Sequence, residues 1–353
     1  MCAKLNNSIV LHRLASDLGL RASVDPVRAV LSYCHRAVKE FLADYPDCPS
    51  PAELLNFLAN KLHTHIVEIH SENDLRRTIK EYTDRGERAF ATLDRELEDD
   101  QSYGITIKLQ SRQPWEPAYV SVIDCRGRKQ QRSYHTKWHE LGHLLILTDQ
   151  SRLAFRRTHD PTQPKSAEES IVDTIAGEFS FYPRMVKPLA HGEISFEKIE
   201  DIRVQACPEA SLYSSVLNIA KLWPTPCVWM EARLAYKKNE NGSQQSFGFQ
   251  DAPRQMLRAV HASPNDAARQ LGLVVIPNFR VPNESVIHRV FFEDLSHAEA
   301  EENLALWRSS DGTHLANRQV RIKAKRLSGS IHALILPTQH IPTFLPCEAA
   351  LTR

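Results

Sequence analysis

Apolar residues in the first part of the chain recur at helical spacing, interrupted by short segments that alternate like strands. Asp25-Pro26 and Ser50-Pro51 each combine a helix-capping side chain with a proline suited to the first helical turn. Residues 73–98 are charged and predict helix. Strands are expected at residues 65–69, 105–109 and 118–123, and helices at 133–147 and 167–181, with a polar loop at 148–166.

After about residue 190 the pattern changes. Helices are expected at 195–205 and 209–222, and strands become frequent beyond Pro224. The expected strands are 227–236, 246–249, 273–276 and 286–292, the expected helices are 252–269 and 295–307, and the expected terminal hairpin is 320–327 with 331–336. We therefore predict an α+β chain with one domain at 1–190, a helix-turn-helix-like connector at 191–224, and a mixed α/β domain at 225–353.

Composition and charge exclude several classes of protein. The chain has 353 residues, of which 42% are hydrophobic, and its formal net charge is +1. This excludes a strongly basic nucleic-acid coat and an acidic disordered chain. No apolar run reaches the ~18–20 residues of a membrane span, and the first residues lack the pattern of a signal peptide, so a cytoplasmic protein is expected. The seven cysteines include no Cys-x-x-Cys pair, so neither a disulfide framework nor a zinc knuckle is expected.

One motif indicates chemistry. His139-Glu140-Leu141-Gly142-His143 has the His-Glu-x-x-His spacing of zinc peptidases, inside a strongly apolar helical segment. Histidines at i and i+4 lie one turn apart on the same helix face, so both can hold one zinc ion. Glu140 is placed to take a proton from water that the zinc activates, which makes it the candidate general base.

A catalytic zinc needs a third protein ligand, and the predicted helix at 167–181 offers several carboxylates. Glu169 and Asp173 are one turn apart on the face that also carries Val172. We predict Glu169 as the ligand and Asp173 as the group that orients a ligand histidine. Glu168 is the competing ligand. If Glu169 points at the metal, Glu168 should point away from it, because neighbouring residues are rotated by about 100° around a helix. The alternative for the whole segment is an acidic first turn favoured by the helix dipole.

The segments RSYHTKWHELGHLLI and EESIVDTIAGEFSFYP resemble the ImmA/IrrE family of intracellular zinc metallopeptidases, over roughly residues 130–185. The resemblance implies a zincin-like domain that cleaves a protein partner, such as a DNA-binding repressor or antitoxin, in stress response or in the control of phages and mobile elements. Some members carry a helix-turn-helix and a GAF-like sensor domain after the peptidase. The resemblance therefore implies a helix-turn-helix-like segment at residues 191–224 and a GAF-like sensor domain at residues 225–353.

A rival hypothesis is a non-enzymatic regulator that binds DNA or a ligand and keeps a structural or vestigial zinc site. The intact Glu140 favours the enzyme, since a structural site does not need it. The helix at 209–222 has one lysine and no arginine, so it offers little to grip phosphate.

Other candidates have simpler interpretations. The basic residues at 126–132 could steer an acidic substrate, but we prefer to interpret them as a solvated loop. For Arg321, Lys323 and Lys325 we prefer the solvated face of a strand. His159 is a candidate donor to an oxyanion, but more simply a loop histidine. Core or interface positions are expected for Trp115, Trp223 and Trp307.

Overall fold

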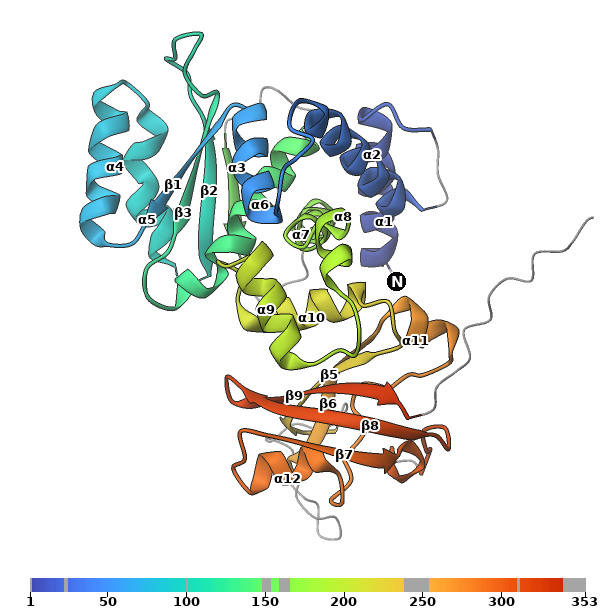
Figure 1. The fold of residues 1–353 in the computed structure, drawn as a ribbon. Helices are drawn as coiled ribbons and strands as arrows, with labels where there is room; N and C mark the ends of the chain where they lie inside the picture. The colour runs from blue at the N-terminus through green and yellow to red at the C-terminus, as the bar shows by residue number, and fades with distance from the viewer. Residues whose placement is uncertain are drawn as a thin grey trace, which may run out of the picture. The chain divides into compact units, whose positions relative to one another are not determined.

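The chain forms two compact units in a computed structural model (Figure 1). The structure describes residues 2–21, 25–99, 101–147, 154–158, 166–237, 254–309 and 312–338. The first unit comprises residues 1–189 and 200–218, and the second comprises residues 190–199 and 219–353. The predicted connector at 191–224 is thus divided between the two units. The chain is of mixed α+β class, with one sheet in each unit.

The first sheet has the strand order β1-β3-β2-β4. Its strands are β1 (Thr64–Ile69), β2 (Ser102–Lys108), β3 (Tyr119–Asp124) and β4 (Ala154–Thr158). β1 and β3 run parallel, whereas β2 is antiparallel to both β3 and β4. The prediction of a polar loop at 148–166 is wrong for residues 154–158, which form β4. Its backbone pairs with β2, and pairing between distant segments is not visible in a local polar pattern.

Helices cover both faces of this sheet (Figure 1). On one face, α4 (Glu72–Asp84) and α5 (Leu93–Glu98) share an apolar core with Ile105 and Ile107 of β2. Because side chains alternate along a strand, Thr106 points to the opposite face, where α6 (Ser133–Leu145) packs on β2 and β3. The other α-helices described up to residue 222 are α1 (Cys2–Asp17), α2 (Pro26–Phe41), α3 (Pro51–Lys61), α7 (Ala167–Phe179), α8 (Pro183–Val186), α9 (Phe196–Ala206) and α10 (Leu212–Leu222).

Helices α6 and α7 approach closely because Gly142 has no side chain at their contact. A Cβ atom on Gly142 would lie 3.1 Å from Cγ1 of Val172. Two buried aromatic side chains, Trp138 and Phe179, stack with their ring centroids 6.3 Å apart. This packing brings the first turn of α7 to the face of α6 that carries the histidine motif.

The second unit contains an antiparallel sheet with the strand order β6-β5-β9-β8-β7. The strands are β5 (Val228–Ala235), β6 (Met256–Pro264), β7 (His297–Asn303), β8 (Gln319–Leu327) and β9 (Ser330–Pro337), and the helices are α11 (Asp266–Gln270) and α12 (Val286–Phe292). β8 and β9 form the predicted terminal hairpin. Helix α12 packs on β7, β8 and β9, and Trp307 is fully buried in the core they share.

Several predictions for the second unit are wrong. Residues 286–292 form helix α12 rather than a strand, because Ser285 caps its first turn and the Glu302 carboxylate accepts a hydrogen bond from the Val286 amide. The Ala- and Glu-rich segment at 297–303 forms edge strand β7 rather than a helix, and 256–264 forms β6. In both, pairing with a neighbouring strand outweighs helix propensity. Residues 273–276 form no strand, and 246–249 lies outside the described residues.

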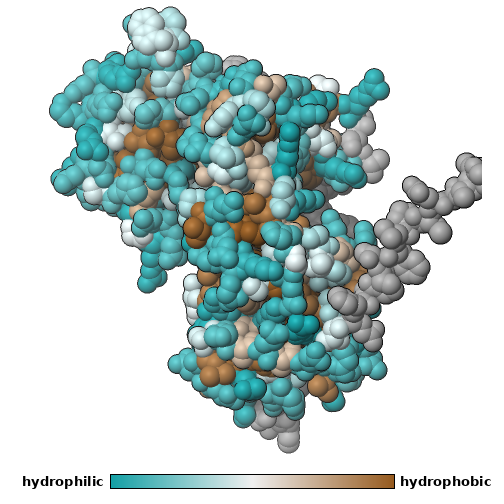
Figure 2. Space-filling view, in the orientation of Figure 1, coloured by the Kyte–Doolittle hydropathy of each residue, from teal (hydrophilic) through white to brown (hydrophobic). Residues whose placement is uncertain are grey.

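The tryptophan and membrane predictions have mixed outcomes. Trp223 and Trp307 are buried as expected, but Trp115 is 81% exposed, in the loop between β2 and β3, so its core assignment is wrong. Among the described helices, none combines the length and apolar character needed to cross a membrane. Polar side chains cover most of the face drawn in Figure 2.

A buried histidine links the hairpin of the second unit to β5. His332 of β9 is fully buried, and its Nδ1 accepts a hydrogen bond from Nε1 of Trp229. Its Nε2 lies 3.2 Å from the hydroxyl oxygen of Ser330, so the proton on Nε2 can be donated there. Burial lowers the pKa of His332 to about 4, although Glu231 acts in the opposite direction. The side chain is therefore neutral in the folded protein at pH 7.

The lowered pKa of His332 predicts that acid reduces the free energy of unfolding. Its pKa in the folded unit lies below the value of about 6.5 in an unfolded chain, so its contribution to stability is complete above pH 6.5 and is lost as the pH falls towards 4. The loss at pH 4 should be about 3 kcal/mol. His332→Asn should flatten the pH dependence of the unfolding free energy, measured by denaturant titration. Equal pH dependence in His332→Asn and wild type would contradict this account.

Candidate metal centre

Two neighbouring helices position the candidate ligands. His139 and His143 lie on α6 one turn apart, and both side chains are 1% exposed. The third candidate, Glu169, lies in the first turn of α7. That turn begins at Ser166, whose hydroxyl accepts a hydrogen bond from the Glu169 amide, as the capping pattern of this helix requires. The cap and the α6–α7 contact together place the first turn of α7 beside the histidines.

The Glu169 carboxylate lies between the two imidazole rings. Its Oε2 is 3.0 Å from Nε2 of His139, and its Oε1 is 3.3 Å from Nε2 of His143. One nitrogen from each ring and one carboxylate oxygen all lie within 4.8 Å of one another. The structure thus brings together the three residues that the sequence analysis nominated. Two imidazoles and one carboxylate form a donor set compatible with a divalent metal ion.

Two further carboxylates lie at the far nitrogens of the rings. Nδ1 of His139 donates a hydrogen bond to Oδ1 of Asp173 at 2.9 Å, which leaves Nε2 to face the site. Asp173 therefore lies where the sequence analysis placed it. Glu168 does not point elsewhere as expected, because its Oε1 is 3.4 Å from Nδ1 of His143. The physical reason is that a long side chain in the first turn of α7 still reaches the buried ring of His143.

The histidines and carboxylates also change each other's protonation. Burial would lower the pKa of His143, but the neighbouring carboxylates of Glu168 and Glu169 outweigh it and raise this pKa to about 9. Burial would raise the pKa of Glu169, but the two histidines outweigh it and lower that pKa to about 2. The carboxylates therefore favour positive charge on His143, and a metal ion that binds there would have to displace the proton.

The candidate base, Glu140, is completely buried on α6. Its Oε2 accepts a hydrogen bond of 2.7 Å from the Thr106 hydroxyl, which also lies 2.6 Å from the hydroxyl oxygen of Ser121. Its Oε1 has no hydrogen-bond partner among the described residues. A buried carboxylate oxygen without a partner is costly, so this atom suggests a bound group that the protein alone does not supply.

Sequence reasoning missed the residues of the sheet that hold Glu140. Thr106 and Ser121 are hydroxyl residues within apolar strands, and that irregularity is the signal that could have found them. Gly104 of β2 faces the same helix, where a Cβ would lie 2.8 Å from Cγ2 of Thr136 and 3.2 Å from Oε1 of Glu140. The strand can approach Glu140 this closely because position 104 carries no side chain.

Part of the basic turn before α6 forms ion pairs within the protein. Asp124 is fully buried, and its carboxylate pairs with Arg126 Nε and Lys129 Nζ, each at 2.8 Å. Arg128 and Arg132 line a groove of about 990 Å³ whose lining includes α4 and α5 but none of the candidate ligands. That these residues steer a substrate stays a prediction.

Two other candidates are simpler to place. The basic face of the terminal hairpin pairs with a carboxylate of its own unit, since Arg321 and Lys323 both contact Glu193. These basic residues therefore lie on a strand face, as predicted, and Glu193 is their ionic partner within the same unit. His159, the candidate oxyanion donor, lies outside the described residues.

Comparisons with known proteins supply no assignment for this centre. No family model matches the chain. A search of curated proteins likewise finds no match. The interpretation of the site therefore depends on its own residues and their geometry.

The ligand assignment predicts a graded loss of metal affinity. Glu169→Ala should remove most of the bound Zn²⁺, because it deletes a charged ligand that faces both histidines. Asp173→Ala keeps all three ligands but releases the ring of His139, and should weaken binding by ~10–100-fold. Glu168→Ala should cause a smaller loss than Asp173→Ala, since its contact with His143 is longer.

Titration with a competing chelator would measure all three variants. Glu53→Ala, an exposed first-turn carboxylate of α3, is the matched control and should bind Zn²⁺ like the wild type. If Glu168→Ala loses the metal while Glu169→Ala keeps it, the third ligand is assigned to the wrong residue.

Proposed function

We propose that this chain is a zinc-dependent endopeptidase whose metal ligands are His139, His143 and Glu169. The observation that carries the proposal is the state of Glu140. It is buried beside the ligand histidines, and its Oε1 has no hydrogen-bond partner among the described residues. A structural metal site has no need of an additional buried carboxylate, whereas hydrolysis requires a base next to the metal.

The protein's own groups divide the work as follows. A zinc ion held by the three ligands would supply a Lewis acid that polarises a carbonyl group and makes water more acidic. Glu140 would accept a proton at Oε1 and later pass it to the leaving amine. Thr106 holds Oε2 by donating a hydrogen bond, which fixes the direction of Oε1. Asp173 holds Nδ1 of His139, so that Nε2 keeps its lone pair for the metal.

The edge strand of the first sheet supports a polypeptide as substrate. Strand β4 contacts α6, and within the part of the chain that the structure describes it pairs with β2 alone. Its other edge can hydrogen-bond to an extended peptide, which would add to the sheet as a further strand. An extended peptide in this position would lie next to the helix of the metal centre.

The finer assignments come from the resemblance of residues 130–185 to ImmA/IrrE peptidases. On that basis the first unit is zincin-like, and the substrate is a protein such as a repressor or antitoxin. The second unit, a five-stranded antiparallel sheet with α12 on it, is proposed as a GAF-like sensor domain. Glu140 also argues against the rival hypothesis of a non-enzymatic regulator, since such a protein gains nothing from a buried base.

Replacement of the base should separate catalysis from metal binding. Glu140→Gln keeps the size and polarity of the side chain but cannot accept a proton at pH 7, so cleavage should fall by a factor of about 10²–10⁴ while Zn²⁺ is retained. Cells that express wild type or Glu140→Gln would be compared for new protein termini. Purified protein would then be tested on the fragments' parent proteins with and without chelator.

Glu178→Gln is the matched control, because this carboxylate of α7 pairs with His35 instead. It should generate the same fragments as wild type. Identical fragments from wild type and Glu140→Gln would show that the base lies elsewhere, or that the chain is not the peptidase. Loss of Zn²⁺ from Glu140→Gln would contradict the separation of roles.

A further inference from the structure

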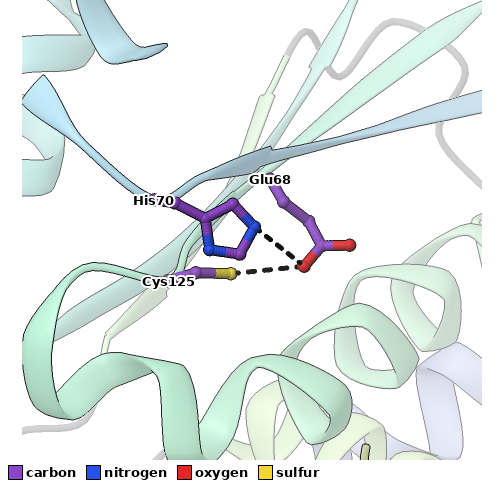
Figure 3. A group of neighbouring side chains, drawn as sticks. All are labelled: Glu68, His70 and Cys125. Carbon is purple, nitrogen blue, oxygen red and sulfur yellow. Dashed lines mark hydrogen bonds and ion pairs between the residues drawn. The ribbon is translucent and has the colours of Figure 1, made fainter. Parts of the chain in front are cut away.

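A second group of potential metal ligands lies at the ends of two parallel strands. Glu68 and His70 come from the end of β1, and Cys125 directly follows β3 (Figure 3). The two strand ends are held together by a hydrogen bond of 2.8 Å from the Cys125 amide to the carbonyl oxygen of Ile69. One donor atom from each of the three side chains lies within 4.8 Å of the others. None of these residues belongs to the centre described above.

The donor atoms converge on one carboxylate oxygen. Oε2 of Glu68 is 3.6 Å from Sγ of Cys125 and 3.6 Å from Nε2 of His70 (Figure 3). Tetrahedral zinc, with bonds of about 2.0–2.3 Å, separates a sulfur and an oxygen ligand by about 3.5–3.7 Å and a nitrogen and an oxygen ligand by about 3.3–3.5 Å. The sulfur–oxygen separation matches this spacing. The nitrogen–oxygen separation lies slightly above it and is too long for a good hydrogen bond. We propose that Glu68, His70 and Cys125 form a second site, for a borderline-soft divalent metal ion such as Zn²⁺.

The second oxygen of Glu68 has a different partner. Its Oε1 lies 2.8 Å from Nζ of Lys137, which also lies 2.6 Å from Oε2 of Glu209. Lys137 is 6% exposed, so this pair is held firmly. A ligand carboxylate whose other oxygen accepts a hydrogen bond is fixed in orientation, as is common around protein metal sites. Lys137 therefore aims Oε2 at the cysteine and the histidine.

Charge favours a divalent ion in spite of the lysine. Two carboxylates face one ammonium, so the group carries one net negative charge when the thiol is protonated. A divalent ion that displaces the thiol proton leaves the group neutral. Burial, and then Glu68, raise the pKa of Cys125 to about 12, so binding must release that proton.

Two of the three side chains of this group are accessible to solvent. Cys125 is 3% exposed, whereas the side chains of His70 and Glu68 are 56% and 36% exposed. An ion can therefore enter from solvent, bind the exposed imidazole and carboxylate, and reach the buried sulfur. Three protein ligands leave the fourth tetrahedral position to water or to a group from outside. The assignment does not rest on the proposed peptidase function, because no residue is shared.

Cobalt(II) provides a probe that separates the two sites. Thiolate bound to Co²⁺ gives an intense near-ultraviolet charge-transfer band, and the site at His139, His143 and Glu169 contains no sulfur. Titration of the full, reduced chain with Co²⁺ should produce this band with the amplitude of one thiolate-bound Co²⁺ per chain, and Zn²⁺ should remove it. The double variant His139→Ala/His143→Ala should keep the band. Its disappearance there would overturn the assignment.

Single substitutions test each ligand. Cys125→Ser should abolish the band, whereas Cys48→Ser, another buried free cysteine, should retain it. His70→Ala should weaken Co²⁺ binding by at least about tenfold, and it is exposed enough to leave folding intact. His65→Ala, an exposed histidine of the same strand, is its control and should bind like wild type. A wild type without the band, a band that survives in Cys125→Ser, or unchanged affinity in His70→Ala would each overturn the proposal.

Discussion

The first unit depends on one contact, in which the Glu169 carboxylate spans Nε2 of His139 and Nε2 of His143. It joins the first turn of α7 to the middle of α6, at a depth where both rings are excluded from water. The contact is possible because Gly142 lets the helices approach. Buried imidazoles need polar partners, and each of the four ring nitrogens lies within 3.4 Å of a carboxylate oxygen of α7. The same arrangement brings together donor atoms compatible with a divalent metal ion.

The sheet completes the site from the other side of α6. Strand β2 presents Gly104, which allows close approach, and Thr106, which donates a hydrogen bond to Glu140. One oxygen of the buried carboxylate is therefore fixed, while Oε1 has no hydrogen-bond partner among the described residues. Glu68 is held in the same way, with Oε1 paired to Lys137 and Oε2 left towards His70 and Cys125. In both groups a hydrogen bond or ion pair within the protein holds one oxygen of the carboxylate.

Local signals were sufficient where the chemistry follows helix geometry. The i, i+4 histidines and the one-turn spacing of Glu169 and Asp173 predicted the ligand group, because both pairs lie within single helices. The orientation of Glu168 could not be predicted, since it depends on how closely α6 and α7 pack. Glu68 and Cys125 are distant in sequence and meet only through the pairing of β1 with β3. Strands β6 and β7 of the second unit were missed for the same reason, since the Ala- and Glu-rich sequence of β7 favours a helix until β8 pairs with it.

The central claim is that a metal ion binds between α6 and α7 through two imidazoles and one carboxylate. A crystal structure of the full chain with Zn²⁺, with an anomalous difference map collected at the zinc absorption edge, tests it most directly. We expect a peak within bonding distance of Nε2 of His139, Nε2 of His143 and the Glu169 carboxylate, with Oε1 of Glu140 facing the remaining coordination position. A map with no zinc peak at these three residues would contradict the account.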